Sequence, residues 1–446
     1  MKLRVFSFLD YFLLFSVLIL IFIGILFIYS SGIDQYGVLT AKGQNEYTRQ
    51  IFFAIAGLVL LIAMVVIDYR KFRQWAPWLY AGIIAVLVYT LIFGHEVKGA
   101  KSWIGVGNFG IQPSEFGKII FILVLARYLE SSSKVQELKR FVTAMFLMLI
   151  PVGLILLQPD LGSASVYIPI FLVMCYMAGL PKRYIFYLIG LGCLTIVLTI
   201  LPFWESMIYK QQIPLFKIFR DLKLRLLIVG ALAVITLIAT AGYILFRTKY
   251  FYWLAYCFSI ITIAFAASAL GSKALADYQI MRIIIFLKPE VDIQGAGWNI
   301  YNSKIAIGSG NLFGRGFLQG TQSHYRFLPE QSTDFIFSIL SEEWGFVGGL
   351  AVIALFSLIF IRGLIIVKNT TNVYGYYVSI GIVFMIFFHF MINVGMVMGI
   401  MPITGIPLLF LSYGGSSLWT AMTGIGLLMS VNLRRDEFYD SYKTEE

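Results

Sequence analysis

YFLLFSVLILIFIGILFIY, residues 11–29, decides the class of fold of this 446-residue chain. The run is almost entirely apolar and is long enough to cross a bilayer as one α-helix. No small-residue cleavage site follows it, so we expect a retained first helix and not a removable signal peptide. Similar runs along the chain predict an all-α protein, a polytopic transmembrane helical bundle of about 12 spans. The expected spans cover residues 11–29, 50–67, 77–94, 113–129, 141–157, 159–178, 185–202, 225–246, 252–270, 343–366, 373–399 and 416–431.

The composition agrees with a membrane protein. The chain is 59% hydrophobic and 13% charged, with a mean hydropathy of +0.85, whereas a soluble domain carries roughly 25% charged residues. The apolar runs are continuous and do not alternate, which argues against a β-barrel. The formal net charge of +11 favours anionic lipid over nucleic acid, because no basic run is long enough to follow a phosphate backbone. The three cysteines lie inside apolar runs without a CxxC pair, so they predict neither a disulfide framework nor a metal site.

Lysine and arginine in the short loops set the orientation, because cytoplasmic loops are enriched in these residues. The clusters fall on one side if both termini are cytoplasmic, which places the stretch from Gly295 to Glu343 outside. We read residues 1–446 as a single membrane domain. The segment from Lys210 to Arg225 fits poorly, since its five cations then lie outside. Either it is an amphipathic segment on the membrane surface, or one flanking span is misplaced.

The stretch from Gly295 to Glu343 is the longest polar, glycine-rich interval of the chain. A long loop of this kind is usually functional. Two interpretations of Asp334 stay open: it caps the helix that follows, or it serves as a general base that draws a proton from a sugar hydroxyl. Charge-assisted hydrogen bonds to phosphate oxygens are the chemistry expected of nearby cations. These candidates are Lys304, Arg315 and Arg326, with Lys118 from an earlier span.

A second polar stretch runs from His95 to Lys118. Its four glycines before Pro113 predict that a helix begins only at that proline. Trp103 is either an interfacial anchor or a stacking surface for a sugar ring. Glu115 and Lys118 lie three apart on one helix face, inside the membrane, where ionisable groups are costly. They form either a structural ion pair or part of a substrate site.

Three further features interrupt the apolar spans. Asp160 follows a proline at a break between two helices, and we expect it to cap the second helix. The prolines and glycines of residues 401–417 exclude a straight helix, leaving the wall of a lipid-accessible groove or an apolar surface loop. His389 and Asn393 share one helix face, where they either form hydrogen bonds between helices or relay protons.

Four ordered motifs carry a resemblance over nearly the whole chain: KGAKSWIGVGNFGIQPSEFGK, LQPDLGSA, SKIAIGSGNLFGRGFLQGTQSHYRFLPEQSTDFIF and GIPLLFLSYGGSS. Together they resemble the shape, elongation, division and sporulation family of membrane peptidoglycan glycosyltransferases. The resemblance implies polymerisation of lipid II, an undecaprenyl-diphosphate disaccharide pentapeptide, at the outer face of the bacterial cytoplasmic membrane, for cell elongation and rod shape. It implies that Asp334 is the catalytic aspartate and that Trp103, Glu115 and Lys118 are functional residues.

The resemblance also implies a class B penicillin-binding protein and the elongation machinery as partners, a divalent cation (magnesium or manganese) with unknown ligands, and no organic cofactor. Family members typically have ten spans. Residues from about 203 to 270 therefore read as an insertion of two spans, and those from about 271 to 342 as a large extracytoplasmic loop that carries the catalytic motif. Two alternatives remain: a lipid II flippase or transporter, and a non-enzymatic scaffold for the penicillin-binding protein.

Overall fold

The computed structural model describes residues 9–97, 99–106, 109–205, 217–274, 277–288, 292, 295 and 297–435. The chain forms two compact units. One contains residues 1–179 and 298–446, and the other contains residues 180–297.

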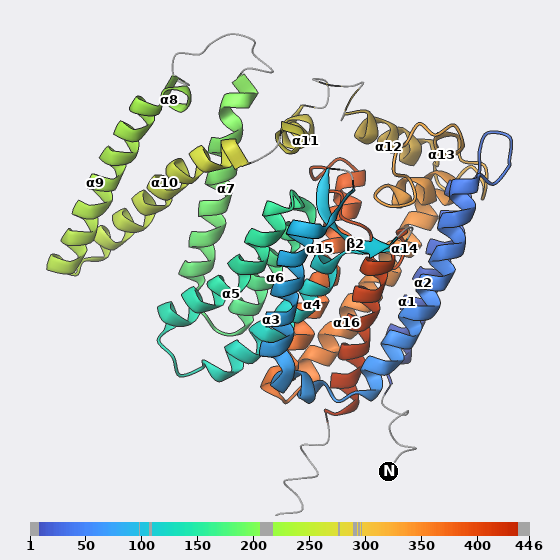
Figure 1. The fold of residues 1–446 in the computed structure, drawn as a ribbon, viewed down its shortest axis with the longest axis horizontal. Helices are drawn as coiled ribbons and strands as arrows, with labels where there is room; N and C mark the ends of the chain where they lie inside the picture. The colour runs from blue at the N-terminus through green and yellow to red at the C-terminus, as the bar shows by residue number, and fades with distance from the viewer. Residues whose placement is uncertain are drawn as a thin grey trace, which may run out of the picture. The chain divides into compact units, whose positions relative to one another are not determined.

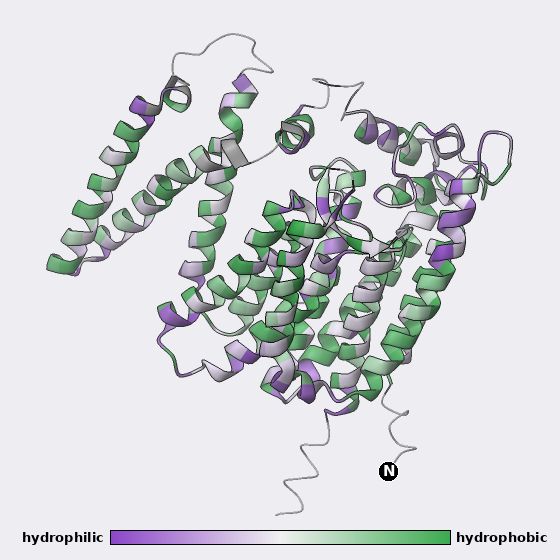
Figure 2. Ribbon diagram, in the orientation of Figure 1, coloured by the Kyte–Doolittle hydropathy of each residue, from purple (hydrophilic) through white to green (hydrophobic). Residues whose placement is uncertain are grey.

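The first unit is a bundle of long helices with a small sheet at one end (Figure 1). Helix α2 packs along α16 and α1 along α14, while α4 and α15 have most of their residues buried among their neighbours. Apolar residues cover the length of the helices, and polar residues gather at their ends and in the connections (Figure 2). The helices are α1 Tyr11–Ser31, α2 Ala41–Val66, α3 Tyr69–Phe93, α4 Pro113–Ser131, α5 Glu137–Leu157, α6 Leu161–Met177, α12 Gly297–Ser309, α13 Thr321–His324, α14 Ile336–Asn369, α15 Val373–Val397 and α16 Gly415–Leu433.

Short polar side chains fix where several helices begin. A helix leaves its first backbone N–H groups without a partner inside the helix, and an N-cap oxygen can accept from one of them. Four such caps are Asp10 for α1, Thr40 for α2, Asp68 for α3 and Asn372 for α15. The spans therefore begin at defined residues, and each apolar run enters the bundle in a fixed register.

Helix α1 begins and α16 ends at the same end of this unit. Arg434, directly after α16, donates hydrogen bonds to the carbonyls of Val65 and Val66 at the end of α2. Helices α1 and α2 are neighbours joined by a short connection, so the end of α2 lies beside the beginning of α1. The sheet and the polar segments described below lie at the opposite end.

The sheet has three antiparallel strands in the order β1-β2-β3. They are β1 His95–Val97, β2 Ala100–Val106 and β3 Phe109–Ile111. Trp103 lies opposite His95, and Gly105 lies opposite Gly110. A Cβ at Gly110 would stand 2.8 Å from the Trp103 ring, so only glycine lets the indole lie this close to β3. Helix α4 then begins at Pro113, which confirms the predicted helix start.

The second unit contains α7 Lys182–Trp204, α8 Lys217–Arg220, α9 Leu222–Phe246, α10 Lys249–Ala274 and α11 Asp277–Leu287. Helix α10 packs against both α9 and α7. Arg225 of α9 is buried and donates a 2.6 Å hydrogen bond to Ser268 of α10. Part of the basic segment noted in the sequence, residues 206–216, lies outside the described residues; the rest forms α8 and the start of α9.

The all-α membrane class is confirmed, and each of the predicted spans coincides with one helix. Nine helices in the described ranges are long and apolar enough to cross a membrane. Three helices begin seven to nine residues before their predicted starts: α2 at Ala41 and not at residue 50, α3 at Tyr69 and not at residue 77, and α14 at Ile336 and not at residue 343. Helix α14 therefore includes the last residues of the stretch predicted as a loop. The division of the chain into a ten-span core and a two-span insertion at about residues 203–270 stays a prediction.

Candidate functional site

The irregular segment between α15 and α16, residues 398–414, supports the residues of the candidate site. It contains no helix, as predicted, and Leu408–Leu411 are at most 2% exposed. An apolar surface loop is therefore excluded. Gly24 of α1 allows the segment to lie this deep, because a Cβ there would stand 2.7 Å from the carbonyl oxygen of Leu411. Backbone that is not helical can lie at membrane depth when protein buries it.

This segment and α15 hold the backbone at Asp334 through three successive carbonyls. The Ser332 carbonyl accepts from the Tyr413 N–H at 2.8 Å, and the Thr333 carbonyl accepts from the Ser412 hydroxyl. The Asp334 carbonyl accepts from Asn393 Nδ2 of α15 at 3.0 Å. Asp334 is half-buried. Helix α14 has Phe335 as its N-cap with no side-chain hydrogen bond, so the interpretation of Asp334 as a helix cap is wrong.

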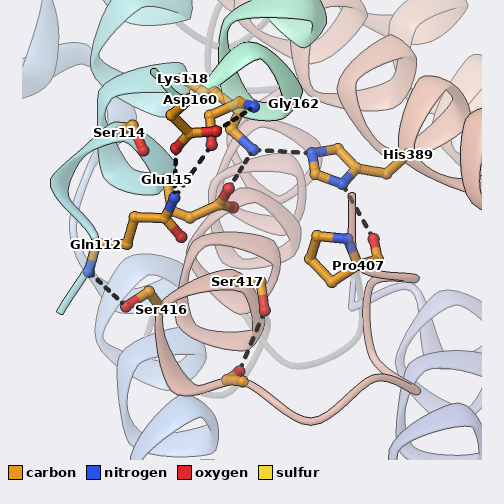
Figure 3. Close-up of polar contacts among 12 residues, drawn as sticks. Gln112, Ser114, Glu115, Lys118, Asp160, Gly162, His389, Pro407, Ser416 and Ser417 are labelled. Carbon is orange, nitrogen blue, oxygen red and sulfur yellow. Dashed lines mark hydrogen bonds and ion pairs between the residues drawn. The ribbon is translucent and has the colours of Figure 1, made fainter. Parts of the chain in front are cut away.

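A buried charge cluster lies one helical turn away along α15, at His389. Lys118 Nζ is 2.7 Å from Glu115 Oε1 and 3.0 Å from His389 Nε2 (Figure 3). Lys118 is 0% exposed and Glu115 is 3% exposed. The geometry confirms the predicted ion pair and gives it a third member from α15. Glu115 Oε2 has no hydrogen-bond partner among the described residues, so this carboxylate keeps one buried acceptor open.

Gln112 joins this cluster to the neighbouring elements at the start of α4. Its backbone N–H donates to Ser416 Oγ at 2.9 Å, and its side-chain amide donates to Asp160 Oδ2 at 2.6 Å (Figure 3). Asp160 Oδ1 accepts from the Ser163 N–H, which confirms the predicted cap of α6. The end of β3 is therefore tied to both α6 and α16.

The predicted cations outside the bundle are exposed and spread over the loop. Lys304 of α12 lies against Gly399, whose Cβ would stand 2.3 Å from Lys304 Cε, so it is on the α15 side of the site. Arg315 donates a 2.9 Å hydrogen bond to Thr321 Oγ1. Arg326 has a left-handed backbone with φ of 56°. Contacts thus bring Asp334, Lys118 and Glu115 together around α15, whereas Arg315 contacts the loop itself.

Residues 310–324, which we call the docked loop, pack against a break in α14 and bond the backbone groups that the break leaves unpaired. Gly345 has φ 65° and ψ −160°, which removes two helical hydrogen bonds. The loop replaces them: the N–H groups of Arg315 and Gly316 donate to the carbonyls of Glu342 and Glu343, and the N–H groups of Phe346 and Val347 donate to the carbonyls of Asn311 and Leu312. Every one of these backbone groups is therefore satisfied, as buried polar groups require.

Two fully buried carboxylates reinforce the docked loop. Glu342 Oε1 accepts from the Thr321 N–H at 2.7 Å, from the Thr321 hydroxyl at 2.9 Å and from the Gln322 N–H at 2.9 Å. Glu343 accepts from the Ser30 hydroxyl of α1 and from the Leu318 N–H. The sequence showed these acids but not their partners, which only the returning loop supplies.

An apolar cavity of about 430 Å³ lies between the sheet and the neighbouring helices. Helices α2, α3, α4 and α16 and strands β2 and β3 contribute its walls, so it lies directly beside the hairpin that carries Trp103. Its lining includes Phe53, Ile83, Ile104, Pro113, Phe116 and Trp419. Such a cavity fits a hydrocarbon chain.

Gln50 is a site-forming residue that the sequence did not reveal. It is 1% exposed in α2; its Nε2 donates to the Ser412 carbonyl and its Oε1 accepts from the Gly414 N–H. A single polar residue at the edge of an apolar run was the only available signal. In the part of the chain that the structure describes, no group of three His, Cys, Asp or Glu residues could hold a metal ion.

The fold and the site define a multi-pass helical membrane protein with charged groups set into one end of its bundle. The chain belongs to the cell cycle protein family of FtsW, RodA and SpoVE, whose sequence model matches residues 11–223 and 220–437.

The relatives are similar over almost their full lengths. Peptidoglycan glycosyltransferase RodA of Treponema pallidum is 52% identical over 98% of this chain and 100% of its own. Peptidoglycan glycosyltransferase MrdB of Escherichia coli is 33% identical over 89% of each chain. A solved structure of a peptidoglycan synthase complex, which coordinates polymerization and crosslinking, is similar with a TM-score of 0.65 and 26% identity, covering 96% of this chain and 98% of that one.

Proposed function

We propose that this peptidoglycan glycosyltransferase polymerises lipid II into glycan strands, with Asp334 as the general base. The observation that carries the proposal is the backbone at Asp334, where three successive carbonyls are held by α15 and by the irregular segment. A rigid backbone that presents a half-buried carboxylate suits a base that must meet one hydroxyl. The activity agrees with that named for the two relatives.

Asp334 would remove the proton from the 4-hydroxyl of the acceptor N-acetylglucosamine. The freed oxygen attacks C1 of the donor N-acetylmuramic acid, and the bond from C1 to the diphosphate oxygen breaks. The lipid diphosphate leaves with the electron pair, and the proton stays on Asp334. Direct displacement inverts the anomeric centre, so one base suffices and no covalent enzyme intermediate forms.

The leaving diphosphate carries its own charge and therefore requires cations more than it requires an acid. Lys304, Arg315 and Arg326 are exposed and can reach an anionic head group. Lys118 and Glu115 are buried together, so within the proposal they set the charge and shape of the inner wall. Trp103 offers its indole as a stacking surface for a sugar.

The apolar cavity is the site we propose for part of the prenyl chain. The prenyl chain would come from lipid and not from water, so van der Waals packing against the apolar lining, and not the hydrophobic effect, would hold it beside the sheet. The cavity and the sheet would place the tail and the sugars on the two sides of one hairpin.

The expected divalent cation stays part of the proposal. Magnesium is commonly bound by one or two carboxylates together with substrate phosphates, and the described residues offer no all-protein cluster. No step above depends on it. A class B penicillin-binding protein is the proposed partner, in line with the crosslinking named for the solved complex. We place both termini in the cytoplasm and the site at the outer face of the cytoplasmic membrane.

Purified protein with its penicillin-binding partner and lipid II tests the proposal. Asp334→Ala should lower glycan polymerisation by about 10²- to 10⁴-fold, the usual contribution of a general base. Glu330→Gln, which neutralises an exposed carboxylate four residues earlier, should retain activity.

The same assay separates the alternatives. Polymerisation by Asp334→Ala at the wild-type rate would remove the base assignment. A wild-type protein that moved lipid II between leaflets but never lengthened glycan would be a flippase. A scaffold would tolerate Asp334→Asn with complex formation and cell shape intact.

A further inference from the structure

One face of α15 contacts both charged parts of the site. His389 and Asn393 are four residues apart, so they lie one above the other on the helix, about 6 Å apart along its axis. Each bonds a site group on one side and a backbone carbonyl of the irregular segment on the other. Their carbonyl partners, Ile406 and Pro407, are consecutive.

The contacts of His389 determine which ring nitrogen carries the proton. Nδ1 is 3.3 Å from the Pro407 carbonyl, which can only accept, so Nδ1 bears the hydrogen (Figure 3). Nε2 is therefore an acceptor and receives a hydrogen bond from Lys118 Nζ at 3.0 Å. A second cation facing this buried ammonium would be strongly unfavourable. His389 is thus a neutral, oriented acceptor with both ring nitrogens engaged, which favours the hydrogen-bonding interpretation over the proton relay.

The contacts of Asn393 are equally directional. Its Nδ2 donates to the Asp334 carbonyl at 3.0 Å and to the Ile406 carbonyl at 2.8 Å. Both partners are acceptors, so the amide nitrogen must occupy this position. Asn393 is 0% exposed, which keeps water from replacing either bond.

We propose that His389 and Asn393 are positioning residues for the transfer reaction, an inference that rests on the proposed function. Neither residue touches the sugars. Together with Ile406 and Pro407 they form two parallel supports that keep Lys118 and the backbone at Asp334 at a fixed separation. A shift of about 1 Å at a reacting group can cost roughly 100-fold in rate, so loss of either support should reduce catalysis.

Steady-state polymerisation of lipid II by the purified complex tests this inference. His389→Leu and Asn393→Leu remove the hydrogen bonds and place an apolar side chain at each position. We expect kcat to fall about 10- to 100-fold and KM to stay within about threefold, as for an interaction that matters mainly in the transition state. His389→Gln offers an acceptor to Lys118 and a donor to Pro407, and it should recover most of the rate.

Three controls separate the possible outcomes. Ser379→Ala removes another fully buried polar side chain of α15 and should leave kcat unchanged. Thermal unfolding of each variant shows whether it is folded. If His389→Leu is unstable, His389→Gln provides the test in its place. A folded His389→Gln variant whose rate is as low as that of a misfolded variant would refute the inference. If both leucine variants had the wild-type kcat while Asp334→Ala remained inactive, the inference would also be overturned. Activity of Asp334→Ala would instead overturn the proposed function.

Discussion

Replacing Glu342 by alanine should release the docked loop from α14. The carboxylate is 0% exposed and accepts the N–H groups of Thr321 and Gln322 through one oxygen. Alanine leaves both amides without an acceptor, and each such loss costs about 1–3 kcal/mol. Water can partly replace the carboxylate, so we expect the loop to open more easily by about 2–4 kcal/mol.

Hydrogen exchange of the protein in detergent or nanodiscs measures this opening directly. A change of 1.36 kcal/mol is a factor of ten, so protection of the peptide that contains Thr321 and Gln322 should fall roughly 30- to 900-fold. Glu342→Gln keeps the accepting oxygen and replaces Oε2, which has no hydrogen-bond partner among the described residues. It should lose far less protection.

Gln319→Ala is the matched control, because it removes an exposed side chain from the same loop. Its protection should equal that of the wild type. Unchanged exchange at Thr321 and Gln322 in Glu342→Ala would refute the reasoning, since it would show that the buried carboxylate does not hold the loop. Equal losses in Glu342→Ala and Glu342→Gln would show that charge matters and the hydrogen-bond geometry does not.

Three further substitutions test the bundle. Gly24→Ala should lower the thermal unfolding temperature and the polymerisation rate together, because its Cβ would meet the backbone of Leu411 at 2.7 Å; a variant with wild-type stability would contradict this contact. Arg140→Met should lower stability by about 2–4 kcal/mol with little effect on KM, since this buried arginine bonds the ends of α4 and α6 far from the site. Asp10→Asn keeps an acceptor for the α1 cap but loses the ion pair with Arg362, so it should be more stable than Asp10→Ala by about 1 kcal/mol; the reverse order in thermal denaturation would contradict the cap.

The helices and the breaks between them could be predicted because their signals are local. A run of apolar residues and a following Pro-Asp pair determine a span and a cap without reference to the rest of the chain, as Asp160 shows. The start of α14 could not be predicted in this way. Glu342 and Glu343 looked like the polar edge of a span, yet the helix continues through them because loop amides satisfy their carboxylates.

The candidate site was only partly visible for the same reason. Asp334 could be singled out, but whether it caps a helix depended on where α14 begins. The supports of its backbone come from Asn393 and Ser412, which are 59 and 78 residues away from it in the sequence. Gln50 and the short sheet also depend on partners from other elements. Contacts over such separations leave no periodic pattern to read.

The break at Gly345 also indicates how far α14 extends beyond the membrane. From Gly345 to Lys368 the helix has about 24 residues and a length of about 35 Å, slightly more than the roughly 30 Å of a bilayer's hydrocarbon layer. The nine residues of α14 before the break therefore extend past the hydrocarbon at one boundary. Adding or removing one residue between Gly345 and Lys368 would move Asp334 by about 1.5 Å along the membrane normal and turn it by about 100°. The length of this one span thus sets the height of Asp334 along the membrane normal, on which the proposed contact with a lipid substrate depends.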